Sequence, residues 1–406
     1  MSDINKRVPK RRFMEFNNAD AWEQRKLGEL GEVTTGKAFS STSFDNQGEY
    51  LVITNKNISD SSRSQNIITN RISISDDEII QRYRLDGENI LVTMDGVNLG
   101  KTAMYSNANA LLAQRVGRIK SNQLEFIYQI TSSNTFLRTM QTLSVGNAIK
   151  HISLKQISEY SSLGPKDIIE RKKIGSFFKK LDNTIALHQR KLEKIKALKT
   201  AYLSELFPAE GETKPKRRFA GFTNDWEQCK LGEFVTIRSG WSPSNFEEAN
   251  DSGSLFVKVD DLNTSTRVQN NSNMKVIENP KYDKMKHGST IFPKRGAAIM
   301  TNKVRILGET GYMDTNMMAL EPRGIVGEFL YTFISRTGLY KIADTSTIPQ
   351  INNKHIEPYE ISLPEIKEQQ KIGTFFKQLD NAIALHQRKL QKLQNIKKAY
   401  LNEMFI

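Results

Sequence analysis

The same helix-forming segment occurs twice in this sequence, and the repeat limits the chain to few architectures. Residues 173–207 and 371–405 are identical at 24 of 35 positions, at a fixed offset of 198. Two further shared motifs lie upstream: PKRRF at 9–13 and 215–219, and W-E-Q-x-K-L-G-E at 22–29 and 226–233. The 406 residues are therefore two copies of one unit of about 200 residues, and two copies are too few for a solenoid.

The segments between the shared motifs have diverged. Between 30 and 164, and between 234 and 363, little sequence is common beyond an early glycine, Gly36 or Gly240, and a late K-x-I. A constant frame around two divergent inserts is expected when two domains do the same kind of work on different targets.

The repeated C-terminal segments have the pattern of two long helices that pair. Alternating steps of three and four from Phe178 and from Phe376 give an apolar stripe of period 3.5 in each segment. Pro165 and Pro364 precede the stripes, where proline is tolerated. Because neither stripe can remain exposed, we expect two helices of about 40 residues, each roughly 60 Å long, to pack as an antiparallel coiled coil.

The residues predicted for the helix-pair interface are Phe177, Phe178, Leu181, Ile185, His188, Leu192 and Tyr202 in the first helix, and Phe375, Phe376, Leu379, Ile383, His386, Leu390 and Tyr400 in the second. His188 and His386 fall on d positions. A polar residue that fixes the register is the favoured interpretation, and a metal site or pH switch is the alternative. Lys199 and Lys397, at a positions, are interpreted in the same way as register-fixing residues.

The divergent segments have the pattern of α+β domains. Residues 50–53, 89–93, 255–259 and 297–300 have strand composition, and helices are expected near 125–131 and 326–335. The fold class predicted for the whole chain is therefore α+β, with two globular domains separated by two long antiparallel coiled-coil helices in a pseudo-twofold repeat.

The charge of the chain favours a polyanionic partner. Lys and Arg number 59 against 45 Asp and Glu, for a net charge of +14. The divergent domains hold none of this excess, because residues 13–165 and 219–364 each carry −1. Cys229 is the single cysteine, which excludes an internal disulfide and fits a reducing compartment. Neither a secretory signal nor a run of about 18 apolar residues occurs, so a cytoplasmic protein without a membrane span is expected.

Motifs for catalysis are missing. Residues 96–102, GVNLGKT, resemble a phosphate-binding loop but have three residues between the glycines where four are needed. Five scattered histidines and one cysteine form no recognisable triad or metal cluster, and Asp95 has no partner that the sequence identifies. We therefore expect no chemistry, no metal and no cofactor on this chain.

Side chains suited to reading DNA bases are plentiful in the loops of both divergent segments. The candidates in the first segment are Lys37, Asn55, Lys56, Asn57, Arg63, Lys101, Gln114, Arg115 and Lys150. The candidates in the second are Lys258, Asn263, Arg267, Asn302, Lys303, Arg305, Gln350, Asn352, Asn353 and Lys354. For any single residue an ordinary polar loop is the simpler interpretation, but the set as a whole favours nucleic acid.

The double arrangement of PKRRF, W-E-Q-x-K-L-G-E, a divergent domain and K-I-G-x-F-F-K-x-L-D-N-x-I-A-L-H-Q-R-K-L resembles the specificity subunit of type I restriction-modification systems. The resemblance covers nearly the whole chain. It implies that each divergent segment is a target recognition domain reading one half of a bipartite, asymmetric double-stranded DNA target. It also implies that the helices set the spacing of the halves and dock two modification (methyltransferase) subunits, to which restriction (motor-nuclease) subunits attach. S-adenosylmethionine, ATP and Mg²⁺ then belong to those partners.

The resulting division of the chain is an N-terminal leading segment at 1–21, recognition domain 1 at 22–164, the first spacer helix at 165–207, a linker with the repeated leading segment at 208–225, recognition domain 2 at 226–363, and the second spacer helix at 364–406. Two other classes of function stay open. A DNA-binding scaffold or regulator with two tandem recognition domains would bind without methyltransferase partners. A nuclease or methyltransferase in its own right would act alone.

Overall fold

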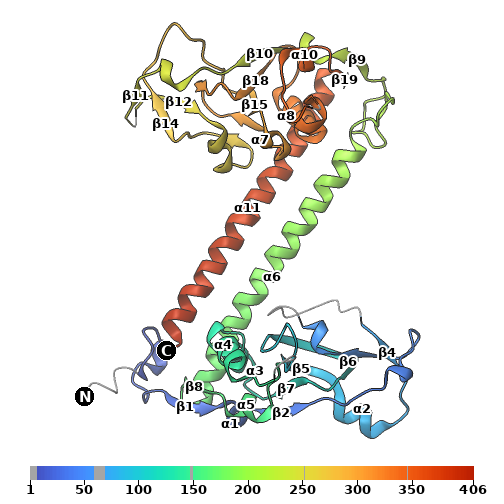
Figure 1. The fold of residues 1–406 in the computed structure, drawn as a ribbon, viewed down its shortest axis with the longest axis vertical. Helices are drawn as coiled ribbons and strands as arrows, with labels where there is room; N and C mark the ends of the chain where they lie inside the picture. The colour runs from blue at the N-terminus through green and yellow to red at the C-terminus, as the bar shows by residue number, and fades with distance from the viewer. Residues whose placement is uncertain (1–6, 59–68, 147–149, 251, 345) are drawn as a thin grey trace. The chain divides into compact units, whose positions relative to one another are not determined.

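The computed structural model describes residues 7–58, 69–146, 150–250, 252–344 and 346–406. The chain forms two compact units, one of residues 1–187 with 391–406 and the other of residues 188–390. The boundaries fall inside the two long helices α6 (Ile168–Glu205) and α11 (Ile366–Met404). Each unit therefore contains one divergent segment and a part of both long helices (Figure 1).

Unit 1 is built on a six-stranded sheet of order β2-β7-β5-β6-β3-β4 with a separate antiparallel pair, β1-β8. Its strands are β1 (Glu23–Lys26), β2 (Glu32–Thr35), β3 (Tyr50–Ile53), β4 (Arg71–Ile72), β5 (Arg84–Thr93), β6 (Thr102–Leu112), β7 (Val116–Lys120) and β8 (Ser161–Gly164). Its shorter helices are η2 (Met14–Phe16), α1 (Leu27–Leu30), η3 (Ser41–Ser43), η4 (Asn55–Asn57), α2 (Asp77–Tyr83), α3 (Leu124–Thr131), α4 (Asn134–Leu143) and α5 (Leu154–Glu159).

The two faces of the central strand β5 are both covered, which explains its continuous apolar run. Ile90 and Val92 join the core that contains Phe126 of α3, whereas Leu91 joins a second core on the opposite face. Successive side chains of a strand point to opposite faces, so a strand buried on both sides needs apolar residues without alternation.

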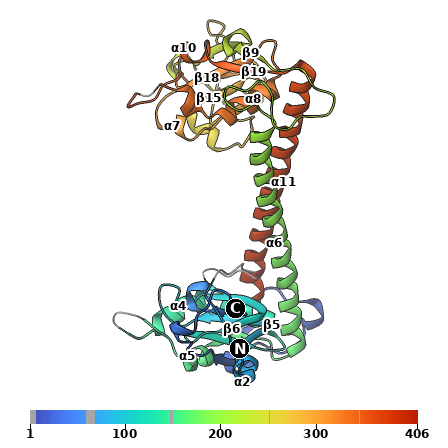
Figure 2. The same cartoon turned by 90° about the vertical axis from the view of Figure 1, so that its right-hand side faces the viewer.

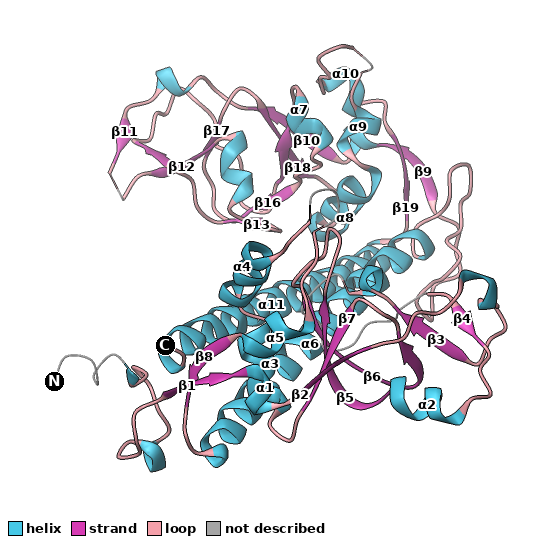
Figure 3. Cartoon of the chain, turned by 60° about the horizontal axis from the view of Figure 1, so that its bottom comes forward, coloured by secondary structure: helices cyan, strands magenta, loops and turns pink. Residues whose placement is uncertain are grey.

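Unit 2 contains sheets of order β10-β18-β15-β16-β13 and β11-β14-β12-β17, with a separate pair β19-β9 (strands magenta in Figure 3). Its strands are β9 (Glu227–Lys230), β10 (Val235–Ser239), β11 (Glu248–Ala249), β12 (Ser254–Val257), β13 (Val268–Gln269), β14 (Met274–Val276), β15 (Thr290–Pro293), β16 (Arg305–Leu307), β17 (Tyr312–Met313), β18 (Met317–Pro322) and β19 (Glu360–Leu363). Its shorter helices are η5 (Leu231–Glu233), η6 (Pro243–Asn245), η7 (Val259–Asn263), α7 (Ala297–Met300), α8 (Gly327–Thr337), α9 (Leu339–Ile342) and α10 (Asn353–Ile356).

The two units share one strand order although their sequences have diverged. In unit 1, β6 pairs antiparallel with β5 and parallel with β3. In unit 2, β16 pairs antiparallel with β15 and β17 pairs parallel with β12, so these two short strands together take the place of β6. Apart from β11 and β13, which are additional strands of unit 2, the order β10-β18-β15-β16/β17-β12-β14 then corresponds to that of unit 1. The structure therefore confirms the internal repeat within the divergent segments as well.

The early glycines of the two segments occupy equivalent places. A Cβ on Gly36 would lie 2.0 Å from the carbonyl oxygen of Leu112, and one on Gly240 would lie 1.9 Å from that of Asp314. Any side chain would therefore separate the leading part of each segment from the strand beside it.

The two long helices run antiparallel within each unit (Figures 1 and 2). In unit 1, Phe177 near the start of α6 contacts Tyr400 near the end of α11. In unit 2, Tyr202 near the end of α6 contacts Phe375 near the start of α11. All a and d positions predicted from the stripe are buried or half-buried. The expected α+β class with a long antiparallel helix pair is thus confirmed.

The core of each unit is closed by the C-terminal end of one long helix. In unit 1, Phe405 after α11 packs on Trp22, Phe126 and Phe178. In unit 2 the residues at the corresponding places are Phe207, Trp226, Phe329 and Phe376. The tryptophan of each W-E-Q motif is therefore a core residue, and each repeated motif has a packing role.

Residues 96–101 and 297–300 lie in the connections that follow β5 and β15. Residues 297–300, predicted as a strand, form the short helix α7, because Gly296 at φ +69° turns the chain out of β15 before them. Residues 96–101 form the turn of the β5–β6 hairpin, where the Gly100 N–H donates to the Thr93 carbonyl oxygen at 2.9 Å. This stretch therefore resembles a phosphate-binding loop in composition only. Within the described residues, no helix is both long and apolar enough to cross a membrane.

Candidate nucleic-acid interface

The loops of unit 1 that hold candidate base-reading residues converge on Asp95, the residue that follows β5 and Met94. Its carboxylate accepts hydrogen bonds from Asn55 and from Arg115, the latter at 2.9 Å. The Asp95 side chain is only 8% exposed, whereas the Arg115 side chain is 60% exposed. A buried carboxylate thus holds an arginine whose other N–H donors face outward.

Backbone hydrogen bonds hold these loops together. The Met94 N–H donates to the Arg115 carbonyl oxygen, and the Ile152 N–H donates to the Met94 carbonyl oxygen. Asp95 also forms a β-bridge with His151, and the Gln114 N–H donates to the Lys37 carbonyl oxygen. Residues from five separate stretches of sequence therefore meet beyond the end of the central strand β5. This group of loops is called the edge of the unit.

The remaining candidates of unit 1 differ in their availability. Lys56, Gln114 and Lys150 are exposed, and Lys37 and Lys101 are half-exposed. Asn57 is occupied inside the protein, because its side-chain oxygen accepts hydrogen bonds from the N–H and hydroxyl of Thr54, both at 2.8 Å. Arg63 lies outside the described residues.

Unit 2 presents the equivalent edge with different side chains. The Lys294 N–H donates to the Asn316 carbonyl oxygen, and the Ile351 N–H donates to the Lys294 carbonyl oxygen. Arg295 forms the β-bridge with Gln350 that Asp95 forms with His151. This shared bonding pattern places Arg295 where unit 1 has Asp95, and Asn316 where unit 1 has Arg115.

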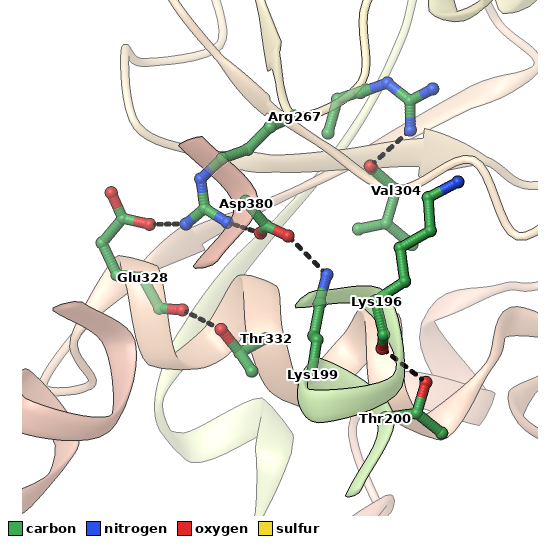
Figure 4. A network of polar contacts seen from close by, with 9 residues as sticks. Lys196, Lys199, Thr200, Arg267, Val304, Glu328, Thr332 and Asp380 are labelled. Atoms are coloured by element: carbon green, nitrogen blue, oxygen red, sulfur yellow. Dashed lines mark hydrogen bonds and ion pairs between the residues drawn. The ribbon is translucent and has the colours of Figure 1, made fainter. Parts of the chain in front are cut away.

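Arg267 was predicted to contact DNA, but the structure places it inside unit 2 (Figure 4). Its guanidinium is bound by the carboxylates of Glu328 and Asp380 and lies 4.4 Å from the ring centre of Tyr331. Asp380 also pairs with Lys199 at 2.6 Å. With 7% of its side chain exposed, Arg267 connects the strand β13 region to α8 and α11 and has no free face for a base.

Arg305 and Asn302 are likewise occupied by the protein. Every nitrogen of the Arg305 guanidinium donates to the loop around residues 262–265 or to the Val304 carbonyl oxygen. The Asn302 amide donates to Ser335 and accepts from the Leu339 N–H, so it joins α7 to α8 and α9. Both side chains are half-buried and bond within the protein, so their role is structural, which corrects the prediction from residue type.

The other candidates of unit 2 lie in several loops. Lys303 donates to the side chain of Asn263. The Lys258 and Asn352 N–H groups bond to side chains of the helical turns that they begin. Gln350 lies at the edge with Arg295, and Asn353 and Lys354 are exposed on α10.

Sequence reasoning missed four residues of the two edges: Asp95, Lys294, Arg295 and Asn316. Lys294 donates to the Ser239 hydroxyl at 2.9 Å, and burial, with repulsion from Arg295, lowers the pKa of its amine. Asp95 follows a strand that the sequence predicted, whereas Lys294 and Arg295 follow β15, which it did not predict. No sequence signal showed which loops meet.

Two ion pairs and one histidine pair join the long helices. Lys397 pairs with Asp182 in unit 1, and Lys199 pairs with Asp380 in unit 2, both at 2.6 Å. The Nδ1 atoms of His188 and His386 lie 2.9 Å apart in unit 2. The lysines and histidines at a and d positions therefore each contact a polar partner on the other helix.

The leading segments dock on the same helices. Arg12 forms two hydrogen bonds of 2.6 Å to Glu170, and Arg218 forms two of 2.7 Å to Glu368. Phe13 contacts Phe177 in the same way as Phe219 contacts Phe375. Each PKRRF motif therefore binds the helix pair through its second arginine and its phenylalanine.

A family model described as the type I restriction modification DNA specificity domain matches the chain twice, over residues 19–197 and 223–395. The chain belongs to this family. Its two matches coincide with the two repeats, so this specificity protein contains two copies of the domain that defines the family.

Known proteins similar to this specificity protein agree with the assignment. The type I restriction enzyme MjaVIII specificity subunit of Methanocaldococcus jannaschii is 22% identical over 403 residues, covering 94% of this chain and 91% of the relative. The crystal structure of the type I restriction-modification system S subunit from M. genitalium has a TM-score of 0.62 at 15% identity, covering 98% of this chain and 99% of that one. This structural similarity shows a shared fold.

Proposed function

We propose that each unit of this specificity protein reads one half of a bipartite, asymmetric sequence in double-stranded DNA. The supporting observation is that one strand order carries two different sets of edge residues. Asp95 and Arg115 form a pair in unit 1, where unit 2 has Arg295 and Asn316. Loops on a constant scaffold can change their side chains without changing the fold, which is what two different half-sites require.

The long helices, in this proposal, set the spacing between the half-sites and dock two modification (methyltransferase) subunits, to which restriction (motor-nuclease) subunits attach. Three leucines support a docking role, because the helix seam leaves them 43–48% exposed: Leu187, Leu198 and Leu385. Apolar side chains exposed on a helix surface are suited to contact with another protein.

The chain performs no catalytic step in this proposal. S-adenosylmethionine, ATP and Mg²⁺ are bound by the partner subunits, and the complex works in the cytoplasm. The recognition domains are residues 22–164 and 226–363, with the spacer helices at 165–207 and 364–406.

Mapping of methylated adenines tests the proposal. Genomes with and without this chain are compared in the presence of the modification subunits, and a bipartite methylated sequence that depends on the chain is expected. Replacement of residues 30–163 by the corresponding segment of another specificity protein should change one half-site and leave the other unaltered. Simultaneous change of both half-sites would contradict independent reading, and failure of the chain to copurify with a modification subunit would favour a DNA-binding regulator.

A further inference from the structure

Arg115 has a backbone conformation that is uncommon for a residue with a side chain. Its φ is +66°, in the left-handed region where glycine is favoured, and Asn302 is the other non-glycine residue with positive φ among the described residues. Asn302 uses its side chain to join helices, whereas the Arg115 side chain is mostly exposed. Strained residues of this kind occur preferentially at functional sites.

Asp95 restricts the position of the Arg115 side chain. One guanidinium nitrogen, Nη1, donates to the buried carboxylate, and no other partner of the guanidinium is found in the described part of the chain. The other N–H donors remain available at the surface. A guanidinium held in one orientation loses less conformational entropy when it binds than a freely rotating one. It can then donate two parallel hydrogen bonds to O6 and N7 of guanine.

Asn55 is bound to the other oxygen of the same carboxylate. It is half-buried and comes from η4, which is distant in sequence from both Asp95 and Arg115. The Asp95 carboxylate therefore holds two base-reading side chains from different loops at one place.

Unit 2 has Arg295 at the position that Asp95 occupies in unit 1. Arg295 is exposed, and its side chain has no hydrogen-bond or ionic partner among the described residues. Asn316, at the place of Arg115, uses its backbone N–H to bond to Asp314 at 2.5 Å. The equivalent edge thus offers a free arginine beside an asparagine.

We propose that Asp95 is a positioning residue for the first half-site, where it holds Arg115 against a guanine, and that Arg295 is the residue that reads guanine in the second half-site. The inference deepens the proposed function and rests on it. Asp95 acts through Arg115 and does not itself contact the base.

Four variants in the complex with its modification subunits test the first half-site: Arg115→Lys, Arg115→Ala, Asp95→Asn and the double variant Asp95→Asn/Arg115→Ala. Binding to DNA libraries randomised in each half-site is measured. Arg115→Lys keeps the charge but not the planar fork, so preference for guanine at one position should fall about 10- to 100-fold. Asp95→Asn should weaken preference at the same position, and the double variant should lose no more than Arg115→Ala alone.

Matched controls separate positioning from folding. Asp86→Asn removes a carboxylate that pairs with Arg84 elsewhere in unit 1, and should leave the sequence preference unchanged. In unit 2, Arg295→Lys should relax one position of the second half-site only, whereas Arg323→Lys, also an exposed arginine, should not. Thermal melting of each variant shows whether the fold is intact.

The outcomes distinguish the inference from the function on which it rests. If the wild-type complex selects a bipartite sequence and both Arg115→Lys and Asp95→Asn keep every preference in the first half-site, the positioning role is wrong and the proposed function stands. An additional loss in the double variant beyond Arg115→Ala would also overturn it. If the wild-type complex selects no sequence at all, both the positioning role and the proposed function are wrong.

Discussion

Single residues at the helix seam couple stability to pH. In the His188–His386 hydrogen bond one Nδ1–H donates and the other Nδ1 accepts, so at least one ring is neutral. Partial desolvation, followed by repulsion from His386, Lys389 and Lys191, lowers the pKa of His188. A lowered pKa in the folded state means that the unfolded chain binds the proton more readily, so stability is lost as the pH falls.

We therefore expect the contribution of this histidine pair to be complete above pH about 6.5 and to disappear as the pH falls through the lower pKa of folded His188. Chemical denaturation at pH 7.5 and pH 5 measures the loss. It should be modest, because His188 is only half-buried, and His188→Leu should reduce it.

A larger loss of stability is expected when the buried ion pair of Arg12 with Glu170 is broken. Glu170 is fully buried and Arg12 is 6% exposed. Arg12→Ala would leave an uncompensated carboxylate in the interior, which typically costs about 3–5 kcal/mol of unfolding free energy. Urea denaturation should show this loss, and Arg12→Met/Glu170→Met should recover most of it. The exposed neighbour offers a control, because Arg11→Ala breaks a surface pair with Glu403 that water screens, so it should lower the stability far less than Arg12→Ala. Equal losses in Arg11→Ala and Arg12→Ala would contradict the argument.

At the scale of elements, a glycine inside each long helix sets how closely a recognition domain packs. A Cβ on Gly175 would lie 2.6 Å from the Phe126 nitrogen at the start of α3, and one on Gly373 would lie 2.7 Å from the Glu328 Cβ in α8. Alanine favours a helix by about 1 kcal/mol over glycine, but here it forces two elements apart. We expect Gly175→Ala to destabilise unit 1 by about 1–3 kcal/mol. Ser176→Ala, at an exposed position of α6, is the control. A stabilised Gly175→Ala protein would show that α3 can move away without loss.

At the scale of the whole molecule, the length of the long helices should determine the length of the non-specific spacer in the DNA target. Insertion of four residues between Ile195 and Lys199 adds about 6 Å of helix. It also displaces Lys199 from Asp380, a contact that the folded helix pair makes at 2.6 Å. Methylome mapping should show a longer spacer, or copurification should show that the complex no longer assembles. An unchanged spacer in an assembled complex would disprove the spacing role.

Much of the architecture was visible in the sequence. Repetition at an offset of 198 revealed two copies of one unit, and the stripe of period 3.5 predicted the helix pair, because both depend on local patterns along the chain. The strands at 50–53 and 89–93 and the helices α3 and α8 followed from composition for the same reason. The strand predicted at 297–300 was wrong, because a positive φ at Gly296, which residue type alone does not reveal, redirects the chain.

Residue type and position in a loop determined, from the sequence alone, that base-reading side chains gather in the divergent segments of a repeated frame. Only the tertiary structure decided which of them are available. It buried Arg267 between Glu328 and Asp380, bonded each guanidinium nitrogen of Arg305 to the protein, and brought Asp95 to Asn55 and Arg115. The physical reason is that burial and hydrogen bonding depend on contacts between residues far apart in sequence, and no local pattern records which loops will meet.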